Sequence, residues 1–180
     1  MRVITGSARG RKLKEPQGSD IRPTTDQVKE AIFNICQFDV EGRRVLDLFG
    51  GTGQLGIAAK SRGAAQVDIV DCAADSIRLI RENGRLTGLD IRVIQADALG
   101  YLNSCGSYDL IFLDPPYDSG LAEKALEAIK AFDILSKGGI IICETRADTV
   151  LPELEPPYAL RRQYRYGKVK LTTYGKETDT

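Results

Sequence analysis

The segment Leu113-Asp114-Pro115-Pro116-Tyr117 has the residue types that point most directly to chemistry. It follows an apolar run, and its two prolines fix the backbone and lack N–H donors, which leaves carbonyl oxygens available to a ligand. A carboxylate, rigid carbonyls and an aromatic ring suit an amino group on a flat base, because the ring can stack on the base. Such acceptors would align the nitrogen lone pair with a methyl donor and take up developing positive charge. The alternative is a proline turn that only ends a core strand.

A glycine-rich segment, VLDLFGGTGQLG at residues 45–56, is the second candidate site. Its glycines Gly51, Gly53 and Gly56 form the pattern G-x-G-x-x-G between a predicted strand and a predicted helix, which permits a tight turn and close approach of a ligand. Dinucleotide enzymes share this pattern. However, Asp47 lies just before it and would repel a pyrophosphate, whereas it could bind a cationic amino group. A turn that serves only the fold is the alternative interpretation.

Two further acids follow the next predicted strands. Asp71 ends the second strand, where a carboxylate can accept hydrogen bonds from both hydroxyls of a ribose. Asp97 follows the third strand and could accept a hydrogen bond from the amino group of adenine, although it could also be an ordinary helix N-cap. Because open α/β sheets bind ligands across the carboxyl ends of their strands, we expect these acids to share one cleft.

The elements that must position these acids alternate as in a parallel α/β sheet. The predicted strands span residues 45–49, 66–71, 91–95, 108–114 and 139–144, and the helices between them span about 54–62, 73–86, 97–103 and 120–132. Strands that are apolar on both faces, such as the run at 140–143, belong in a sheet covered by helices on both sides. Residues 158–166 and 168–174 predict a closing antiparallel pair.

Two of the helices can be predicted in more detail, one at its N-cap and the other in its buried face. Residues 26–36 predict a helix that begins with a capping box, in which Thr24 is the N-cap and Gln27 its partner. The helix over 120–132 is expected to lie on the sheet through one apolar stripe. This stripe comprises Leu121, Ala125, Ile129 and Phe132.

The formal net charge of the 180 residues is zero, but the charges are segregated. Residues 1–14 and 161–176 are basic and contain no acid. Their cations are Arg2, Arg9, Arg11, Lys12 and Lys14 at the beginning, and Arg161, Arg162, Arg165, Lys168, Lys170 and Lys176 near the end. This distribution favours one face for phosphates and another for a cofactor, and the alternative is that the basic ends serve only solubility. Because histidine is absent, acid–base work falls to carboxylates, tyrosine, lysine or the backbone.

The remaining composition narrows the protein class. Hydrophobic residues make up 42% of the chain, which is enough for the core of a single compact domain. The four cysteines include no C-x-x-C pair and are expected to be reduced packing residues of a cytoplasmic protein without a metal. No apolar run approaches the roughly 18 residues of a membrane helix, and we expect neither a signal peptide nor a membrane partner.

With these motifs in view, the sequence resembles a known family. The glycine-rich segment, Asp71, Asp97 and the DPPY motif resemble the class I methyltransferases that modify amino groups. The opening RVITGSARGRKLKEP, the following RPTTDQVKEAIFN and the final YGKVKLTTY resemble the bacterial RsmD family, the small-subunit ribosomal RNA guanine-N2 methyltransferases. The resemblance covers nearly the whole chain. Gly50 is a departure, since many relatives have alanine there, but both residues are small.

The resemblance implies a Rossmann-like class I methyltransferase fold. This fold has a seven-stranded, mostly parallel sheet with an antiparallel last strand and helices on both faces. The residues RVITGSARGRKLKEP themselves predict a β-hairpin with a basic tip before it, because two short strand-like pieces flank a Gly/Ser/Arg turn. Residues 1–20 would form that basic hairpin extension, and residues 21–180 the methyltransferase domain. The resemblance also implies S-adenosylmethionine as the donor, S-adenosylhomocysteine as the product, and N2 of a specific guanine in 16S ribosomal RNA of an assembling small subunit as the acceptor. We expect a monomer.

Carried over by position, the resemblance assigns roles to particular residues. Asp114, Pro115, Pro116 and Tyr117 would receive the guanine, and the helix from Thr24 onward would cover the cofactor site. The cofactor-binding residues would be Asp47, Phe49, Gly51, Gly53, Asp71, Cys72, Asp97, Ala98 and Thr25. The RNA backbone would be held by Arg9, Arg11, Lys12 and Arg22, where phosphate contacts add affinity but little sequence information.

Three other functions remain as alternatives. A DNA adenine-N6 or cytosine-N4 methyltransferase also uses D/N-P-P-Y, but such enzymes usually carry a sizeable target-recognition domain, for which this chain has no room. A non-catalytic RNA-binding assembly factor could use the same scaffold, and binding of S-adenosylmethionine would distinguish it from an enzyme. A nicotinamide dehydrogenase is disfavoured by Asp47 and by the lack of an evident hydride-handling residue.

Overall fold

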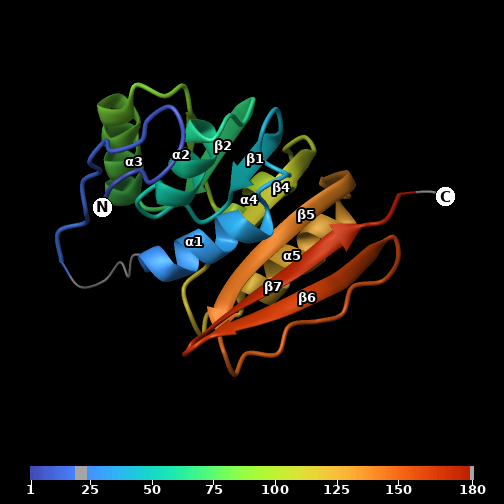
Figure 1. The fold of residues 1–180 in the computed structure, drawn as a ribbon. Helices are drawn as coiled ribbons and strands as arrows, with labels where there is room; N and C mark the ends of the chain where they lie inside the picture. The colour runs from blue at the N-terminus through green and yellow to red at the C-terminus, as the bar shows by residue number, and fades with distance from the viewer. Residues whose placement is uncertain (19–23, 179–180) are drawn as a thin grey trace.

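The sheet of this computed structural model, which describes residues 1–18 and 24–178, has seven strands (Figure 1). The strands are β1 (Arg44–Asp47), β2 (Gln66–Asp71), β3 (Arg92–Gln95), β4 (Tyr108–Leu113), β5 (Leu135–Arg146), β6 (Tyr158–Tyr166) and β7 (Val169–Lys176). Their order is β3-β2-β1-β4-β5-β7-β6. The first five strands pair in parallel, whereas β7 is antiparallel to both β5 and β6. The predicted mostly parallel sheet is therefore confirmed.

Helices cover both faces of the sheet. They are α1 (Asp26–Ile35), α2 (Gln54–Ser61), α3 (Ala74–Thr87), α4 (Ala98–Leu102) and α5 (Leu121–Ala131). Side chains of α1, α2 and α3 enter one core cluster, and side chains of α4 and α5 enter a second. Neighbouring strand residues alternate between the two, as Val45 and Leu46 do, because successive side chains of a strand point to opposite faces.

The first helix begins at Asp26 as predicted, but its N-cap is one residue later than predicted. Its N-cap is Thr25, whose hydroxyl oxygen accepts a hydrogen bond from the backbone N–H of Val28 at 3.3 Å. The predicted capping box of Thr24 and Gln27 is therefore wrong. The hydroxyl of Thr24 instead donates to Asp114 at 3.0 Å, a partner 90 residues away.

The buried stripe of α5 is also shifted from its predicted position. It consists of Ala122, Ala125, Leu126 and Ile129. Phe132 was expected on this stripe but is 50% exposed. It is the C-cap, so it lies beyond the last helical turn and does not follow the helical period.

The N-terminal hairpin, residues 1–13, doubles back on itself through one antiparallel bridge between Arg2 and Lys12 rather than through two regular strands. It is tied to the end of α2 by Ser61, whose hydroxyl oxygen accepts from the N–H of Ala8 at 3.0 Å and donates to the carbonyl of Thr5 at 2.7 Å. Its apolar side chains Val3, Ala8 and Leu13 are buried in the same core cluster as α1 and α2. The hairpin therefore packs against the body of the molecule.

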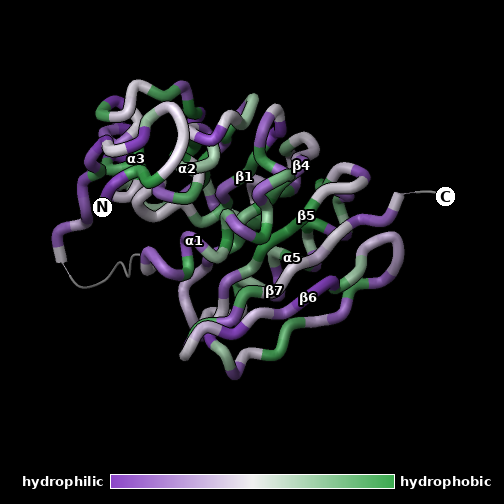
Figure 2. Tube along the Cα trace, in the orientation of Figure 1, coloured by the Kyte–Doolittle hydropathy of each residue, from purple (hydrophilic) through white to green (hydrophobic). Residues whose placement is uncertain are grey.

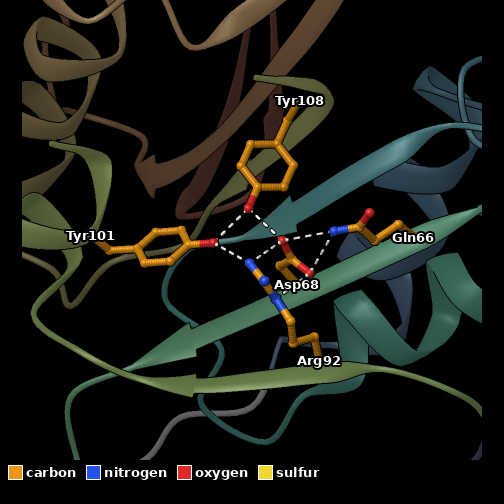
Figure 3. Close-up of polar contacts among 5 residues, drawn as sticks. All are labelled: Gln66, Asp68, Arg92, Tyr101 and Tyr108. Carbon is orange, nitrogen blue, oxygen red and sulfur yellow. Dashed lines mark hydrogen bonds and ion pairs between the residues drawn. The ribbon is translucent and has the colours of Figure 1, made fainter. Parts of the chain in front are cut away.

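A polar network around a buried carboxylate joins three strands to α4 (Figure 3). Its centre is Asp68 of β2, a fully buried carboxylate that accepts hydrogen bonds from Tyr108 of β4 at 2.5 Å and from two nitrogens of Arg92 of β3 at 3.0 and 3.1 Å. Tyr101 of α4 shares a 2.6 Å hydrogen bond with Tyr108 and accepts another from Arg92. Because a buried carboxylate is costly unless its oxygens are satisfied, this network fixes the short α4 on the sheet.

Candidate functional site

A cavity of about 490 Å³ lies at the carboxyl ends of the parallel strands. It lies where the strand order reverses between β1 and β4, which is the usual ligand position in open α/β sheets. Its volume is in the range of small-molecule sites. Five acids line it, one from each parallel strand or the loop after it. They are Asp47, Asp71, Asp97, Asp114 and Glu144.

Asp47 is the last residue of β1 and is 1% exposed. One of its carboxylate oxygens accepts a hydrogen bond from the N–H of Gly56 at 3.0 Å, while the other has no hydrogen-bond partner among the described residues. Burial raises the pKa of Asp47 from 3.8 to about 8; the Gly56 N–H lowers this pKa, and the nearby charges of Asp114 and Asp71 raise it further. A buried acceptor of this kind in a cavity wall suits a cationic donor.

The glycine-rich loop is held in shape by the acid of the next strand. Gly51 has φ +58°, and its N–H donates to one carboxylate oxygen of Asp71 at 2.9 Å. The other oxygen of Asp71 accepts from the N–H of Ala73 at 2.9 Å. An ionised carboxylate has about four acceptor positions, so both oxygens retain capacity for the hydroxyls of a ribose.

The three glycines of the motif have different structural roles. Gly51 lines the cavity. Gly53 is not among the lining residues; it forms the left-handed N-cap of α2 at φ +82°. Gly56 allows α2 to pack closely on β2, since a Cβ there would lie 2.6 Å from the side chain of Ile69. The structure thus brings only the first of these glycines to the candidate cofactor site.

The DPPY motif follows β4 and lines the cavity with all four of its residues. Burial raises the pKa of Asp114 from 3.8 to about 6, and the hydrogen bond from Thr24 lowers it. Asp114 is therefore mainly ionised at neutral pH and can accept hydrogen bonds. The hydroxyl of Tyr117 donates to Glu144 of β5 at 3.2 Å, which ties the ring to the cavity wall. Thr25 at the start of α1 also lines the cavity.

The far end of the cavity is lined by residues around β2 and β3. Asp97 is the N-cap of α4 and accepts a hydrogen bond from the N–H of Gly100 at 2.8 Å. Asp97 is thus an N-cap and also lines the cavity, and its contact with an adenine amino group stays a prediction. Phe49, Cys72 and Ala98, all expected at the cofactor, line the same space.

The predicted RNA-binding residues lie outside this cavity. Arg9, Arg11 and Lys12 are exposed on the N-terminal hairpin, and none of them lines the cavity. Arg22 lies outside the described residues. Within residues 1–18 and 24–178, no group of histidine, cysteine and acidic side chains is arranged to hold a metal ion. No helix in the described part of the chain is long and apolar enough to span a membrane.

Several cavity residues escaped the analysis of the sequence. Glu144 ends the predicted strand 139–144, so the rule that selected the other strand-end acids could have selected it. Gln54 reaches the carbonyl of Thr24 with its side-chain N–H at 3.4 Å and so joins α2 to the segment before α1. Val169 comes from the antiparallel β7, and no local signal marks it as a cavity residue.

The fold and the cavity can be compared with known proteins. The model of the family described as Conserved hypothetical protein 95 matches residues 1–175. The chain belongs to this family. The Bacillus subtilis protein YlbH is 37% identical over 182 residues, which cover 98% of this chain and 99% of the relative. Ribosomal RNA small subunit methyltransferase D of Escherichia coli (strain K12) is 32% identical over 179 residues, which cover 98% of this chain and 90% of the relative.

Comparison with solved structures agrees with this family assignment. The structure of yhhF from Escherichia coli matches with a TM-score of 0.88 and 30% identity over 98% of both chains. A structure from Thermus thermophilus matches with a TM-score of 0.83 and 28% identity over 99% of both chains. The predicted resemblance to the RsmD family and the predicted class I methyltransferase fold are therefore confirmed.

In this member of the Conserved hypothetical protein 95 family, the cavity fits the cofactor that such a fold implies. The buried oxygen of Asp47 without a partner among the described residues suits the amino group of a methionine moiety. A Cβ built on Gly51 would meet no atom within 4 Å, so the loop leaves open space for a ligand beside its backbone. The acids at the end of β2 and after β3 line the same cavity, and carboxylates there can accept hydrogen bonds from hydroxyl or amino groups.

Proposed function

We propose that this chain is an S-adenosylmethionine-dependent methyltransferase that methylates N2 of a guanine in 16S ribosomal RNA. The observation that carries the proposal is that one cavity contains both the buried Asp47 and the complete DPPY motif. The name of the Escherichia coli relative supports ribosomal RNA as the substrate, because that relative is similar over nearly the whole chain. Guanine and its N2 position rest on the resemblance to the RsmD family.

Three acids of the cavity would hold the donor. Asp47 would receive its amino group, Asp71 its ribose hydroxyls, and Asp97 the amino group of its adenine. When bound, S-adenosylmethionine supplies an electrophilic methyl group on a sulfonium. Phe49, Cys72 and Ala98 would line the space around it, and Thr25 at the start of α1 would help to cover it.

The DPPY motif would hold the acceptor. The ionised carboxylate of Asp114 and a backbone carbonyl of the Pro115-Pro116 pair accept hydrogen bonds from the amino group, and the ring of Tyr117 stacks on the base. These contacts direct the nitrogen lone pair toward the methyl group. Asp114 also accepts the surplus proton of the methylated nitrogen, a role that its raised pKa of about 6 supports.

The basic N-terminal segment would bind the substrate outside the cavity. Within this proposal, residues 1–20 form the RNA-binding extension and residues 21–180 the methyltransferase domain. Arg9, Arg11, Lys12 and Arg22 contact phosphates of an assembling small subunit. We also propose that the protein acts as a monomer in the cytoplasm.

The proposal is tested by combining purified protein with S-adenosylmethionine and small-subunit particles from a strain that lacks the gene. Mass spectrometry of digested RNA should then show the appearance of N2-methylguanosine. Asp114→Ala and Tyr117→Ala should abolish methyl transfer but retain cofactor binding. Asp118→Ala is the matched control, because this exposed acid follows the motif directly and pairs with Arg146 outside the cavity. Wild-type rates in either motif variant would contradict the assigned roles.

A further inference from the structure

The edge strand β6 contains an irregularity that changes the direction of its side chains. Leu160 pairs with Tyr174 of β7 and Arg162 pairs with Thr173, so Arg161 is an extra residue without a partner in the register. Such a bulge re-aims side chains and often occurs at sheet edges and beside functional sites.

The bulge directs two consecutive arginines to the same face of the sheet. Arg162 lies opposite Thr173, which pairs with Ile142, a member of the core cluster beneath α1 and α2. Arg161 lies across Gly175, since a Cβ at that glycine would be 2.6 Å from Nε of the guanidinium. Gly175 pairs with Ile140, which packs against the same cluster, so both arginines lie on the α1 side.

Two tyrosines continue this row toward the cavity. Beyond the bulge the two-residue period of the strand places Tyr164 and Tyr166 on the side of Arg162. Both rings are half-buried and pack against the α1-side cluster. Tyr166 pairs directly with Val169, which lines the cavity. The four side chains of Arg161, Arg162, Tyr164 and Tyr166, here named the β6 stripe, therefore lead to the active site.

The surroundings of the β6 stripe are open and basic. In Figure 1, α1 lies in front of the sheet above β5 and α5 lies behind it, and no helix of the described chain covers the near side of β6. Figure 2 shows a largely hydrophilic tube along this strand. The segment 158–176 contains no acid, and two of its cations, Arg161 and Arg162, lie on this face. This charge favours a polyanion and disfavours a basic protein surface.

We propose that the β6 stripe binds the single-stranded RNA that flanks the target base. The guanidinium groups of Arg161 and Arg162 contact phosphates, and the rings of Tyr164 and Tyr166 stack on unpaired bases. Sequence-specific RNA recognition usually uses such splayed, single-stranded segments, and a base that enters the cavity must be unstacked from its neighbours. The inference rests on the proposed function and adds a second RNA contact to that of the N-terminal hairpin.

The test compares Arg161→Gln/Arg162→Gln with the wild type. The double variant should raise the KM for RNA, while kcat at saturating RNA, the Kd for S-adenosylmethionine and the melting temperature stay unchanged. Two phosphate contacts to a single strand contribute a salt slope of about 1.4, so between about 50 and 200 mM salt the wild type should lose about sevenfold more affinity than the variant. Tyr164→Leu should weaken binding, and Tyr164→Phe should restore it, because the ring is retained.

Arg165→Gln is the matched control, because Arg165 is on the same strand but points to the opposite face. An unchanged KM and salt slope in the double variant, or an equal effect of the control, would overturn the inference. A defect seen only with assembled particles and not in binding of naked 16S RNA fragments would also overturn it, since the partner would then be a ribosomal protein. If the wild type methylates no RNA, the proposed function itself fails.

Discussion

Replacing Asp47 by asparagine removes a buried ionisable carboxyl group at the centre of the proposed cofactor site with little change of shape. The amide oxygen of asparagine can still accept the hydrogen bond from Gly56. What changes is the second oxygen, which lies buried without a partner among the described residues and is proposed to meet the amino group of S-adenosylmethionine. The substitution therefore separates the electrostatic role of this residue from its packing.

The effect on stability follows from the pKa of Asp47. Burial raises this pKa from 3.8 to about 8, and each unit corresponds to about 1.4 kcal/mol. Between these two values the folded state keeps a proton that the unfolded state has lost, so stability falls as pH rises, by up to about 1.4 kcal/mol per unit for this group. Asp47→Asn lacks this term. The free energy of unfolding of the variant minus that of the wild type should therefore increase from pH 5 to pH 8, by roughly 2–4 kcal/mol in total.

The same substitution should weaken the binding of S-adenosylmethionine, although it stabilises the folded protein at higher pH. A cationic group beside Asp47 favours the ionised carboxylate, so the wild type should release about one proton when it binds S-adenosylmethionine at pH 6.5. Asp47→Asn should release none, and its Kd should be about tenfold to a hundredfold higher, because hydrogen bonds to charged groups contribute about 1.5–3 kcal/mol.

Titration calorimetry in two buffers of different ionisation enthalpy measures the proton count, and urea unfolding from pH 5 to pH 8 measures the stability. Asp148→Asn, which changes an exposed acid outside the cavity, is the control. Equal proton release by Asp47→Asn and the wild type, or parallel stability profiles, would refute the assigned environment of Asp47.

Three further predictions concern the same cavity and its support. Protonated Asp114 cannot take up the proton of the methylated nitrogen and is a weaker acceptor, so the rate of methyl transfer should fall as pH decreases through about 6; a rate that is flat from pH 7 to pH 5 would exclude this role. Gly51→Ala places a Cβ on a residue in the left-handed region, so the free energy of unfolding measured in urea should fall by about 1–2 kcal/mol. Calorimetry should also show a higher Kd for S-adenosylmethionine, and unchanged values of both would show that the loop relaxes without strain. Tyr108→Phe removes a hydrogen bond from the buried Asp68, so unfolding should cost about 1–3 kcal/mol less free energy, and an unchanged value would show that water replaces the hydroxyl.

The arrangement of the site was largely predictable because it depends on local patterns. Asp71, Asp97 and Asp114 end or follow predicted strands and Asp47 lies within one just before the glycine motif, and parallel strands place their carboxyl ends at one edge. Glu144 obeys the same rule on β5 and could have been included. The boundaries were less predictable, as the shift of the N-cap by one residue shows, since adjacent threonines offer two equivalent caps.

The sequence by itself thus determined the class of fold, the succession of strands and helices along the chain and four of the five acids that line the cavity, because these follow from residue types within a few positions of one another. Only the tertiary structure decided that Thr24 binds Asp114, that Tyr117 binds Glu144, and that Val169 reaches the cavity. It also decided that Arg161 and Arg162 share a face. These contacts depend on the register between strands and on the bulge in β6, and the register is set by pairing between segments far apart along the chain.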